Sequence, residues 1–219
     1  MATNIFVHKM NFFDSIYKKD KDQKKMNFSL EVGPHTDLET LPPVKDVYVT
    51  MLPGGDYKET AAKSGDLVKK GFNPVPHFPA RSILDEQQLK DFITRCKDVG
   101  TKQALVIGGS RDPIGKFDSS IQILETGFFE GIKIGIAGHP EGSPDISDKE
   151  LEKAMMDKKP YADYIVTQWL LDSQPIVDFI SKQSVPVHVG ITGPMKISSL
   201  IKFANIVGAK NSINFLRSN

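Results

Sequence analysis

Short, almost uniformly apolar runs alternate with amphipathic stretches along most of this chain. Runs such as ALVIGG, IGIAG and YIVTQW are typical of strands buried on both faces of a parallel sheet. The stretches between them carry apolar residues at helical spacing, and several begin with Asp or Ser and end near Gly. The pattern predicts strands at 27–32, 46–52, 73–78, 103–108, 133–138, 163–168 and 186–191. It predicts helices at 56–70, 85–98, 118–128, 148–158, 174–183 and 196–207.

Regular alternation of strand and helix without a change in composition predicts one α/β domain. We therefore expect a (β/α)8-type (TIM) barrel over residues 27–219, forming the catalytic domain. A closed barrel of this class needs about eight strands, and the pattern supplies seven. Three explanations are open: the barrel is incomplete at its C-terminus, the barrel is open, or the pattern has missed one strand. An open doubly wound sheet is the alternative fold. Residues 1–26, which contain FFDSIYKKDKDQKK, are predicted to form a helical extension outside the barrel.

Composition narrows the functional classes. Lys and Arg total 28 against 27 Asp and Glu, so no overall field attracts nucleic acid or a membrane surface. The single cysteine, Cys96, excludes an intrachain disulfide and a cysteine-based metal cluster, and its helical context predicts a packed residue. No apolar run approaches the roughly 18–20 residues that span a bilayer, and the N-terminus lacks the order of a signal peptide. These features predict a cytoplasmic protein.

Polar side chains gather where the predicted strands end. In βα folds, ligands bind at the carboxyl ends of the strands, so these side chains are the candidate site. They are Glu31, Thr50, His77, Ser110, Arg111, Asp112, His139 and Gln168.

Glu31 is the strongest candidate for a catalytic residue, because burying an ionised carboxylate in an apolar strand is costly unless the carboxylate is paired or protonated. Desolvation would raise its pKa into the range of a general acid; the alternative is a buried salt bridge with a helix lysine. Asp112 could orient a heterocycle, cap the next helix or pair with Arg111. The Gln168 amide suits the paired donors and acceptors of a pterin or pyrimidine edge, or ties two strand ends together.

Other chemistries find less support in the sequence. His77 and His139 could join Glu31 or Asp112 in a metal site, but their spacing matches no compact ligand motif. A hydrolase triad would lack its Gly-x-Ser-x-Gly elbow, and no Gly-x-Gly-x-x-Gly dinucleotide fingerprint is present.

Seven segments in order carry a resemblance to a known family. They are SLEVGP at 29–34, VTM at 49–51, PHF at 76–78, SRDPIG at 110–115, HPEGSP at 139–144, ADYIVTQWLLD at 162–172 and VGITGP at 189–194. Together they resemble strand-end motifs of the methylenetetrahydrofolate reductase family over about residues 28–216.

The resemblance implies an activity and a role for each matching residue. Reduction of 5,10-methylenetetrahydrofolate to 5-methyltetrahydrofolate would use NAD(P)H through FAD, within one-carbon metabolism and methionine biosynthesis. Glu31 would protonate the leaving amine of the folate, Asp112 would contact pterin and flavin, and Gln168 would bind the folate. The implied cofactor-binding residues are Thr50, His77, Ser110, Arg111, Asp112, His139 and Lys153.

The chain also departs from the family pattern. Ser110-Arg111 stands where the family has Arg-Gly, and His139 replaces a tyrosine. In the family, basic residues hold the flavin pyrophosphate. The corresponding positions of this chain are Met156 and Asp157, and Lys153 lies nearby in the sequence. Two alternatives follow: a flavin-free tetrahydrofolate-dependent methyltransferase or demethylation enzyme, and a non-catalytic barrel subunit that needs a partner to supply its missing strand. The expected partners are a tetrahydrofolate derivative and either further copies of the chain in a homo-oligomer or a partner subunit.

Overall fold

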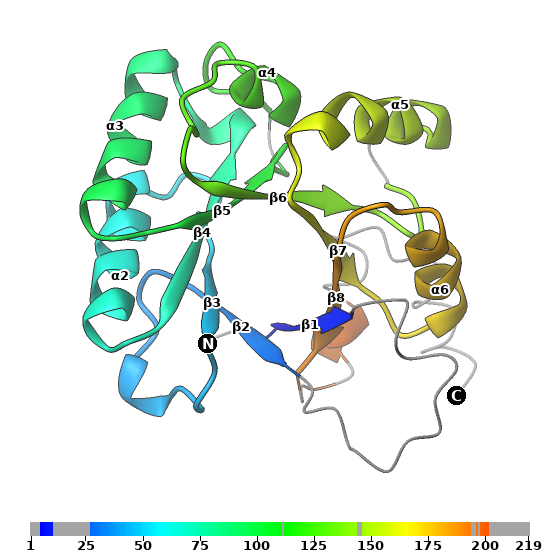
Figure 1. Ribbon diagram of the computed structural model, residues 1–219, viewed down its shortest axis with the longest axis horizontal. Coiled ribbons are helices and arrows are strands. Elements are labelled where there is room, and N and C mark those ends of the chain that lie inside the picture. The colour runs from blue at the N-terminus through cyan, green and yellow to red at the C-terminus, as the bar shows by residue number, and fades with distance from the viewer. Residues whose placement is uncertain are drawn as a thin grey trace.

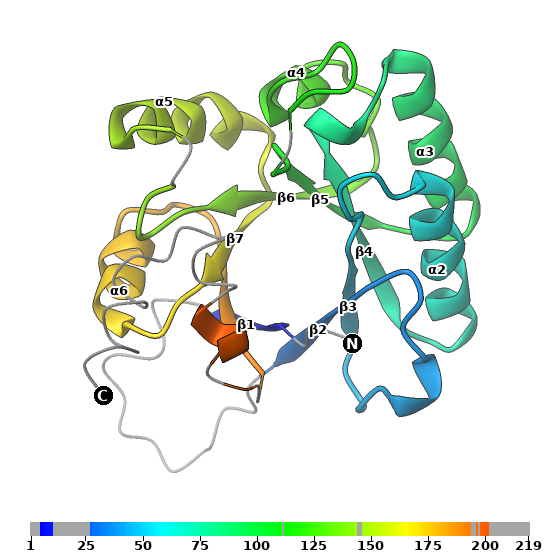
Figure 2. The same ribbon diagram turned by 180° about the vertical axis from the view of Figure 1, so that it is seen from behind.

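A curled sheet of seven parallel strands forms the centre of the molecule, and all seven predicted strands are confirmed (Figures 1 and 2). The computed structural model describes residues 5–10, for which it gives the backbone alone, and residues 27–110, 112–143, 146–193, 196 and 198–201. The parallel strands are β2 (Phe28–Val32), β3 (Asp46–Val49), β4 (Asn73–Pro79), β5 (Gln103–Ile107), β6 (Lys133–Gly138), β7 (Tyr164–Trp169) and β8 (Val187–Thr192). Each pairs with the next along the chain, without the reversal of strand order that marks a doubly wound sheet.

An additional strand from the N-terminus corrects the predicted boundaries. β1 (Ile5–Met10) pairs antiparallel with both β2 and β8, so the eight strands form a closed hydrogen-bonded ring. Residues 5–10 were expected in a helical extension outside the barrel, and the barrel was expected to lack a strand at its C-terminus. The N-terminal strand joins the sheet because β2 and β8 would otherwise each leave a row of backbone N–H and C=O groups unpaired. β1 forms hydrogen bonds with both rows. The helix expected over FFDSIYKKDKDQKK lies outside the described residues.

The helices lie outside the ring of strands in both views (Figures 1 and 2). They are α2 (Tyr57–Lys69), α3 (Glu86–Asp98), α4 (Ser120–Leu124), α5 (Asp148–Lys158) and α6 (Ser173–Ser181), with 3-10 turns η1 (Leu38–Thr40), η2 (Ala80–Ser82) and η3 (Lys159–Tyr161). Asp56, Asp85, Ser147 and Asp172 cap four helices by accepting backbone N–H groups, which confirms the predicted start signals. α4 is shorter than predicted. Of the helix expected at 196–207, residues 196 and 198–201 are described, and residues 198–201 are helical.

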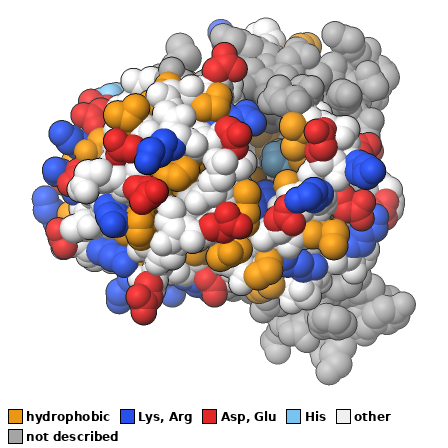
Figure 3. All heavy atoms as spheres, turned by 90° about the horizontal axis from the view of Figure 1, so that it is seen from above, with side chains coloured by type: hydrophobic (Ala, Val, Ile, Leu, Met, Phe, Trp, Pro, Cys, Tyr) orange, Lys and Arg blue, Asp and Glu red, His pale blue; other side chains and the backbone are white. Residues whose placement is uncertain are grey.

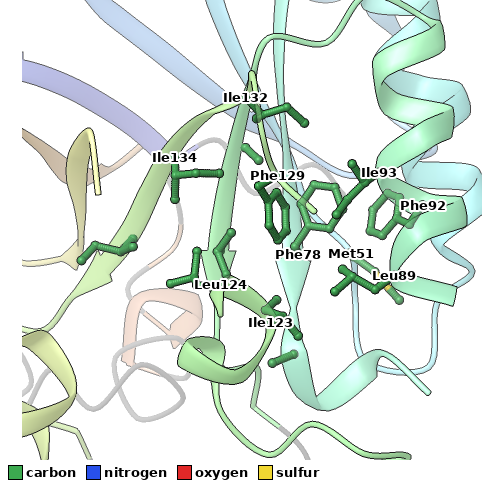
Figure 4. Packing of buried hydrophobic residues seen from close by; sticks show 14 of the residues in the cluster. Met51, Phe78, Leu89, Phe92, Ile93, Ile123, Leu124, Phe129, Ile132 and Ile134 are labelled. Atoms are coloured by element: carbon green, nitrogen blue, oxygen red, sulfur yellow. The ribbon is translucent and has the colours of Figure 1, made fainter. Parts of the chain in front are cut away.

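The main core lies between the sheet and its outer helices. Phe78 of β4 packs against Phe92 of α3, with ring centroids 4.1 Å apart, and against Phe129 at 5.1 Å (Figure 4). Cys96 is fully buried in this layer, as its helical context predicts. A separate cluster, formed by Tyr48, Val75, Leu105, Tyr164 and Val166, comes from alternate positions of the strands and lines the inside of the barrel.

Gly135 of β6 makes room for a ring inside the barrel. A Cβ at this position would lie 2.5 Å from the Tyr164 ring, so only glycine allows β6 and the tyrosine of β7 to approach this closely. Tyr164 therefore fills the interior at this level with 1% of its surface exposed.

The outer surface mixes both signs of charge. The described part of the face in Figure 3 shows acidic and basic side chains intermingled over the helices. Within the described ranges, no helix combines the length and apolarity needed to cross a bilayer.

Candidate functional site

The register of the strands decides which side chains face the inside of the barrel. Glu31 is opposite Tyr48, Tyr48 is opposite Val75, and His77 is opposite Leu105. Because side chains alternate between the two faces of a strand, Glu31 and His77 share the inner face with the interior cluster around Tyr48. The neighbours Val47 and Val49 face outward and pack on Leu67 of α2.

Glu31 and His77 contact each other within the barrel. Glu31 Oε2 lies 3.7 Å from His77 Nε2, and the two side chains are 18% and 9% exposed. Burial raises the pKa of Glu31 to about 7 and lowers the pKa of His77 to about 4. Between these values both groups are neutral, so the contact is a carboxylic acid beside an imidazole and not an ion pair. No lysine of the described chain pairs with Glu31, so the described residues give no support to the alternative of a buried salt bridge with a helix lysine.

Three further polar side chains of the described residues belong to the interior, and they are not among the residues predicted from the strand ends. The Tyr48 hydroxyl lies 2.8 Å from Nδ1 of His188, and the His188 ring stacks on Tyr164 with centroids 4.5 Å apart. Tyr48 also meets His77 edge to face, with centroids 6.1 Å apart and an interplanar angle of 71°. Each of the three occupies an inward position of an apolar strand, as in VYV, YIV and VHV, and that alternation was the available signal.

Thr50, Gln168 and His139 lie at or just beyond the strand ends, as predicted, and all three are half-buried. The Thr50 amide and hydroxyl both donate to the Val32 carbonyl, at 2.9 and 3.3 Å, which ties the end of β3 to β2. Gln168 is on β7 at an irregularity in the pairing with β8 between Val166 and Trp169. Such an irregularity redirects side chains at a barrel rim.

The structure does not bring every predicted residue to Glu31. Ser110 and Asp112 are exposed after β5, on a loop whose later part bonds to the η2 segment through the Ile114 amide and the Arg81 carbonyl. Neither makes a hydrogen bond or ion pair with Glu31 or His77. Arg111 lies outside the described residues. Lys153 is exposed on α5, where it pairs with Asp157.

Other kinds of site are not found in the described ranges. No group of three or more His, Cys, Asp or Glu side chains there is placed to hold a metal ion. A pocket of about 330 Å³ lies between η1 and α2, but its lysines are engaged: Lys63 by the Thr36 carbonyl, Lys69 by Asp66 and Lys70 by Glu39. The interior of the barrel around Glu31 is therefore the candidate active site.

No known protein-family model matches the sequence. The likeness to methylenetetrahydrofolate reductases thus stays a prediction from the strand-end motifs.

Proposed function

We propose that this protein is a cytoplasmic TIM-barrel enzyme of one-carbon metabolism that reduces 5,10-methylenetetrahydrofolate to 5-methyltetrahydrofolate with NAD(P)H through a flavin. One observation carries the proposal: Glu31 faces the inside of the barrel beside His77, and burial raises its pKa to about 7. The order of the strand-end motifs supplies the identity of the substrate.

The chemistry requires a proton donor that works near neutral pH. When the methylene carbon receives a hydride, its bond to the amine nitrogen breaks, and the electron pair left on that nitrogen takes up a proton. A carboxyl with a pKa of about 7 is about half protonated at neutral pH, and the protonated form can release its proton as the amine leaves. His77, neutral under these conditions, does not compete by drawing the proton away from Glu31.

The residues near Glu31 fit the ring of a flavin. His77 Nε2 is buried and has no hydrogen-bond partner among the described residues, so a polar ring edge would satisfy it. Thr50 and His77 would hold the ring. Bound FAD would supply the relay of hydride from NAD(P)H to the folate. Gln168 and Asp112 would bind the pterin, the latter from the loop after β5.

A second function is favoured by the residues that the resemblance places near the pyrophosphate of a bound FAD. Lys153, which the resemblance assigns to the pyrophosphate, is engaged by Asp157, and Met156 is an exposed apolar residue where the family has a cation. Poor neutralisation of a pyrophosphate weakens its binding. A flavin-free, tetrahydrofolate-dependent methyl-transfer or demethylation enzyme is the alternative. The hypothesis of a subunit that needs a partner assumed a missing strand. β1 occupies the position of that strand, so no partner is needed to supply it.

Titration of the purified full chain with FAD, NADH and tetrahydrofolate tests the proposal. Flavin absorbance that NADH bleaches and methylenetetrahydrofolate restores supports the reductase. A colourless protein that binds tetrahydrofolate supports methyl transfer, and binding of neither rejects both.

The Glu31→Gln variant tests the assigned acid. We expect folate turnover to be abolished and flavin reduction by NAD(P)H to continue, because only the protonation step is lost. The exposed Glu125→Gln variant is the matched control and should keep both activities. Unchanged folate turnover in Glu31→Gln removes Glu31 from this role.

A further inference from the structure

The hydrogen bond between Tyr48 and His188 joins two side chains of the barrel interior that the proposed reaction does not use. We propose that Tyr48, held by His188, is a positioning residue that keeps water away from the Glu31 carboxyl and fixes His77 against it. The inference rests on the proposed role of Glu31 as the acid, and it adds two residues to that site.

The geometry places the Tyr48 ring between the two histidines. One side meets His77 edge to face, and the hydroxyl at its end meets His188 Nδ1 at 2.8 Å. Tyr48 is also opposite Glu31 in the β2–β3 register and is 1% exposed. The two side chains are therefore neighbours on the inner face, where the proposal has the Tyr48 ring limit the approach of water to a carboxyl whose side chain is 18% exposed.

The hydrogen bond joins the Tyr48 hydroxyl to Nδ1 of His188, and the tautomer of the His188 ring sets which of the two donates. Burial raises the pKa of Tyr48 well above its ordinary value, so the phenol keeps its proton. Stacking on Tyr164, at an interplanar angle of 21°, holds the plane of the His188 ring. The hydroxyl of Tyr48 is thus held by His188 of β8, whose ring stacks on Tyr164 of β7, while the Tyr48 ring meets that of His77 of β4 edge to face.

Two charged residues of the described strands, Asp46 and Lys133, lie at the amino ends of those strands. Asp46, the first residue of β3, accepts hydrogen bonds from the amides of Asn73 and Gln103. Lys133, the first residue of β6, has its ammonium 5.7 Å from the centroid of the Tyr164 ring. β1 borders β2 and β8, and its side chains are not among the described parts of the chain. Burial is the cause of the raised pKa of Glu31, so access of water to the carboxyl controls that pKa.

The test measures the pKa of Glu31 directly in the full chain without substrate. Infrared difference spectra across a pH titration report the band of the protonated carboxyl, which is assigned by its loss in Glu31→Gln. We expect Tyr48→Phe to lower the pKa by about 1, a tenfold change in proton affinity, because the ring stays but its anchor is lost.

Two matched variants separate positioning from general loosening of the barrel. Tyr57→Phe is the same substitution at a tyrosine whose hydroxyl donates to Asp91 and whose ring packs on the outer core instead of the barrel interior, and it should leave the pKa unchanged. His188→Asn keeps an acceptor near the position of Nδ1 and should also keep the pKa near that of the wild type.

An unchanged pKa in Tyr48→Phe, or an equal fall in Tyr57→Phe, overturns the inference. Because the titration contains no folate, its failure is distinct from failure of the proposed function. A lowered pKa in Tyr48→Phe, together with a wild-type protein that does not bind folate, supports the positioning role and rejects the reductase.

Discussion

Replacing Glu31 by glutamine removes a titratable group from the barrel while keeping its shape, so stability becomes a measure of the buried charge. Burial raises the pKa from 4.5 to about 7 in the folded protein. A tenfold change in proton affinity corresponds to about 1.4 kcal/mol, so the ionised carboxylate destabilises the native state by about 3 kcal/mol relative to a carboxyl with its ordinary pKa.

The sign follows from which state binds the proton more tightly. The folded state does, so the stability that this proton contributes is full below pH 4.5 and is lost as the pH rises through about 7. Glutamine never ionises. The stability advantage of Glu31→Gln over the wild type should therefore be about 1 kcal/mol at pH 5 and about 3 kcal/mol at pH 8.

Urea unfolding at several pH values between 5 and 8 gives the two free energies of unfolding, with tryptophan fluorescence or circular dichroism as the probe. The opposite change at His77, whose pKa falls to about 4, is common to both proteins and cancels in the difference. Glu125→Gln, at an exposed position, should show a difference from the wild type that does not change with pH. A constant difference for Glu31→Gln as well would mean that the carboxyl is hydrated in the native state, and the reasoning for a raised pKa would be refuted.

Two further predictions concern the packing. Gly135→Ala should lower the free energy of unfolding by about 1–3 kcal/mol in the same urea assay, because its Cβ would lie 2.5 Å from the Tyr164 ring; no loss would mean that the ring does not fill this space. Cys96 should react with a thiol reagent only as fast as the protein opens, since it is fully buried and its pKa is raised to about 12. Rapid reaction of the native protein would contradict that burial.

The sequence determined the parallel part of the sheet. All seven apolar runs are strands whose ends differ from the expected ends by at most three residues. Strands buried on both faces can be recognised locally, because nearly every position must be apolar whatever the partner strand is. The caps at Asp56, Asp85, Ser147 and Asp172 are equally local, since each depends on backbone groups within the next three residues.

The place of β1 could not be derived in this way. IFVHKM is a short apolar run interrupted by His8 and Lys9, and nothing near it in the chain indicates a partner. Its partners are the free edges of β2 and β8, which come together only when the seven parallel strands curl. The need for an eighth strand was visible from the sequence, but its source and its antiparallel direction were not.

For the candidate site too, the sequence determined some features and the tertiary structure decided the others. A carboxyl at position 31 of an apolar strand already implied burial and a raised pKa, because these depend on the polarity of the strand itself. The neighbours of that carboxyl depend on register and closure. Tyr48 and His188 are 140 residues apart in the chain and meet because β3 and β8 face each other across the barrel. Local patterning thus decided which side chains point inward, and only the tertiary structure decided which of them touch, because contact across a barrel is fixed by the stagger of all its strands.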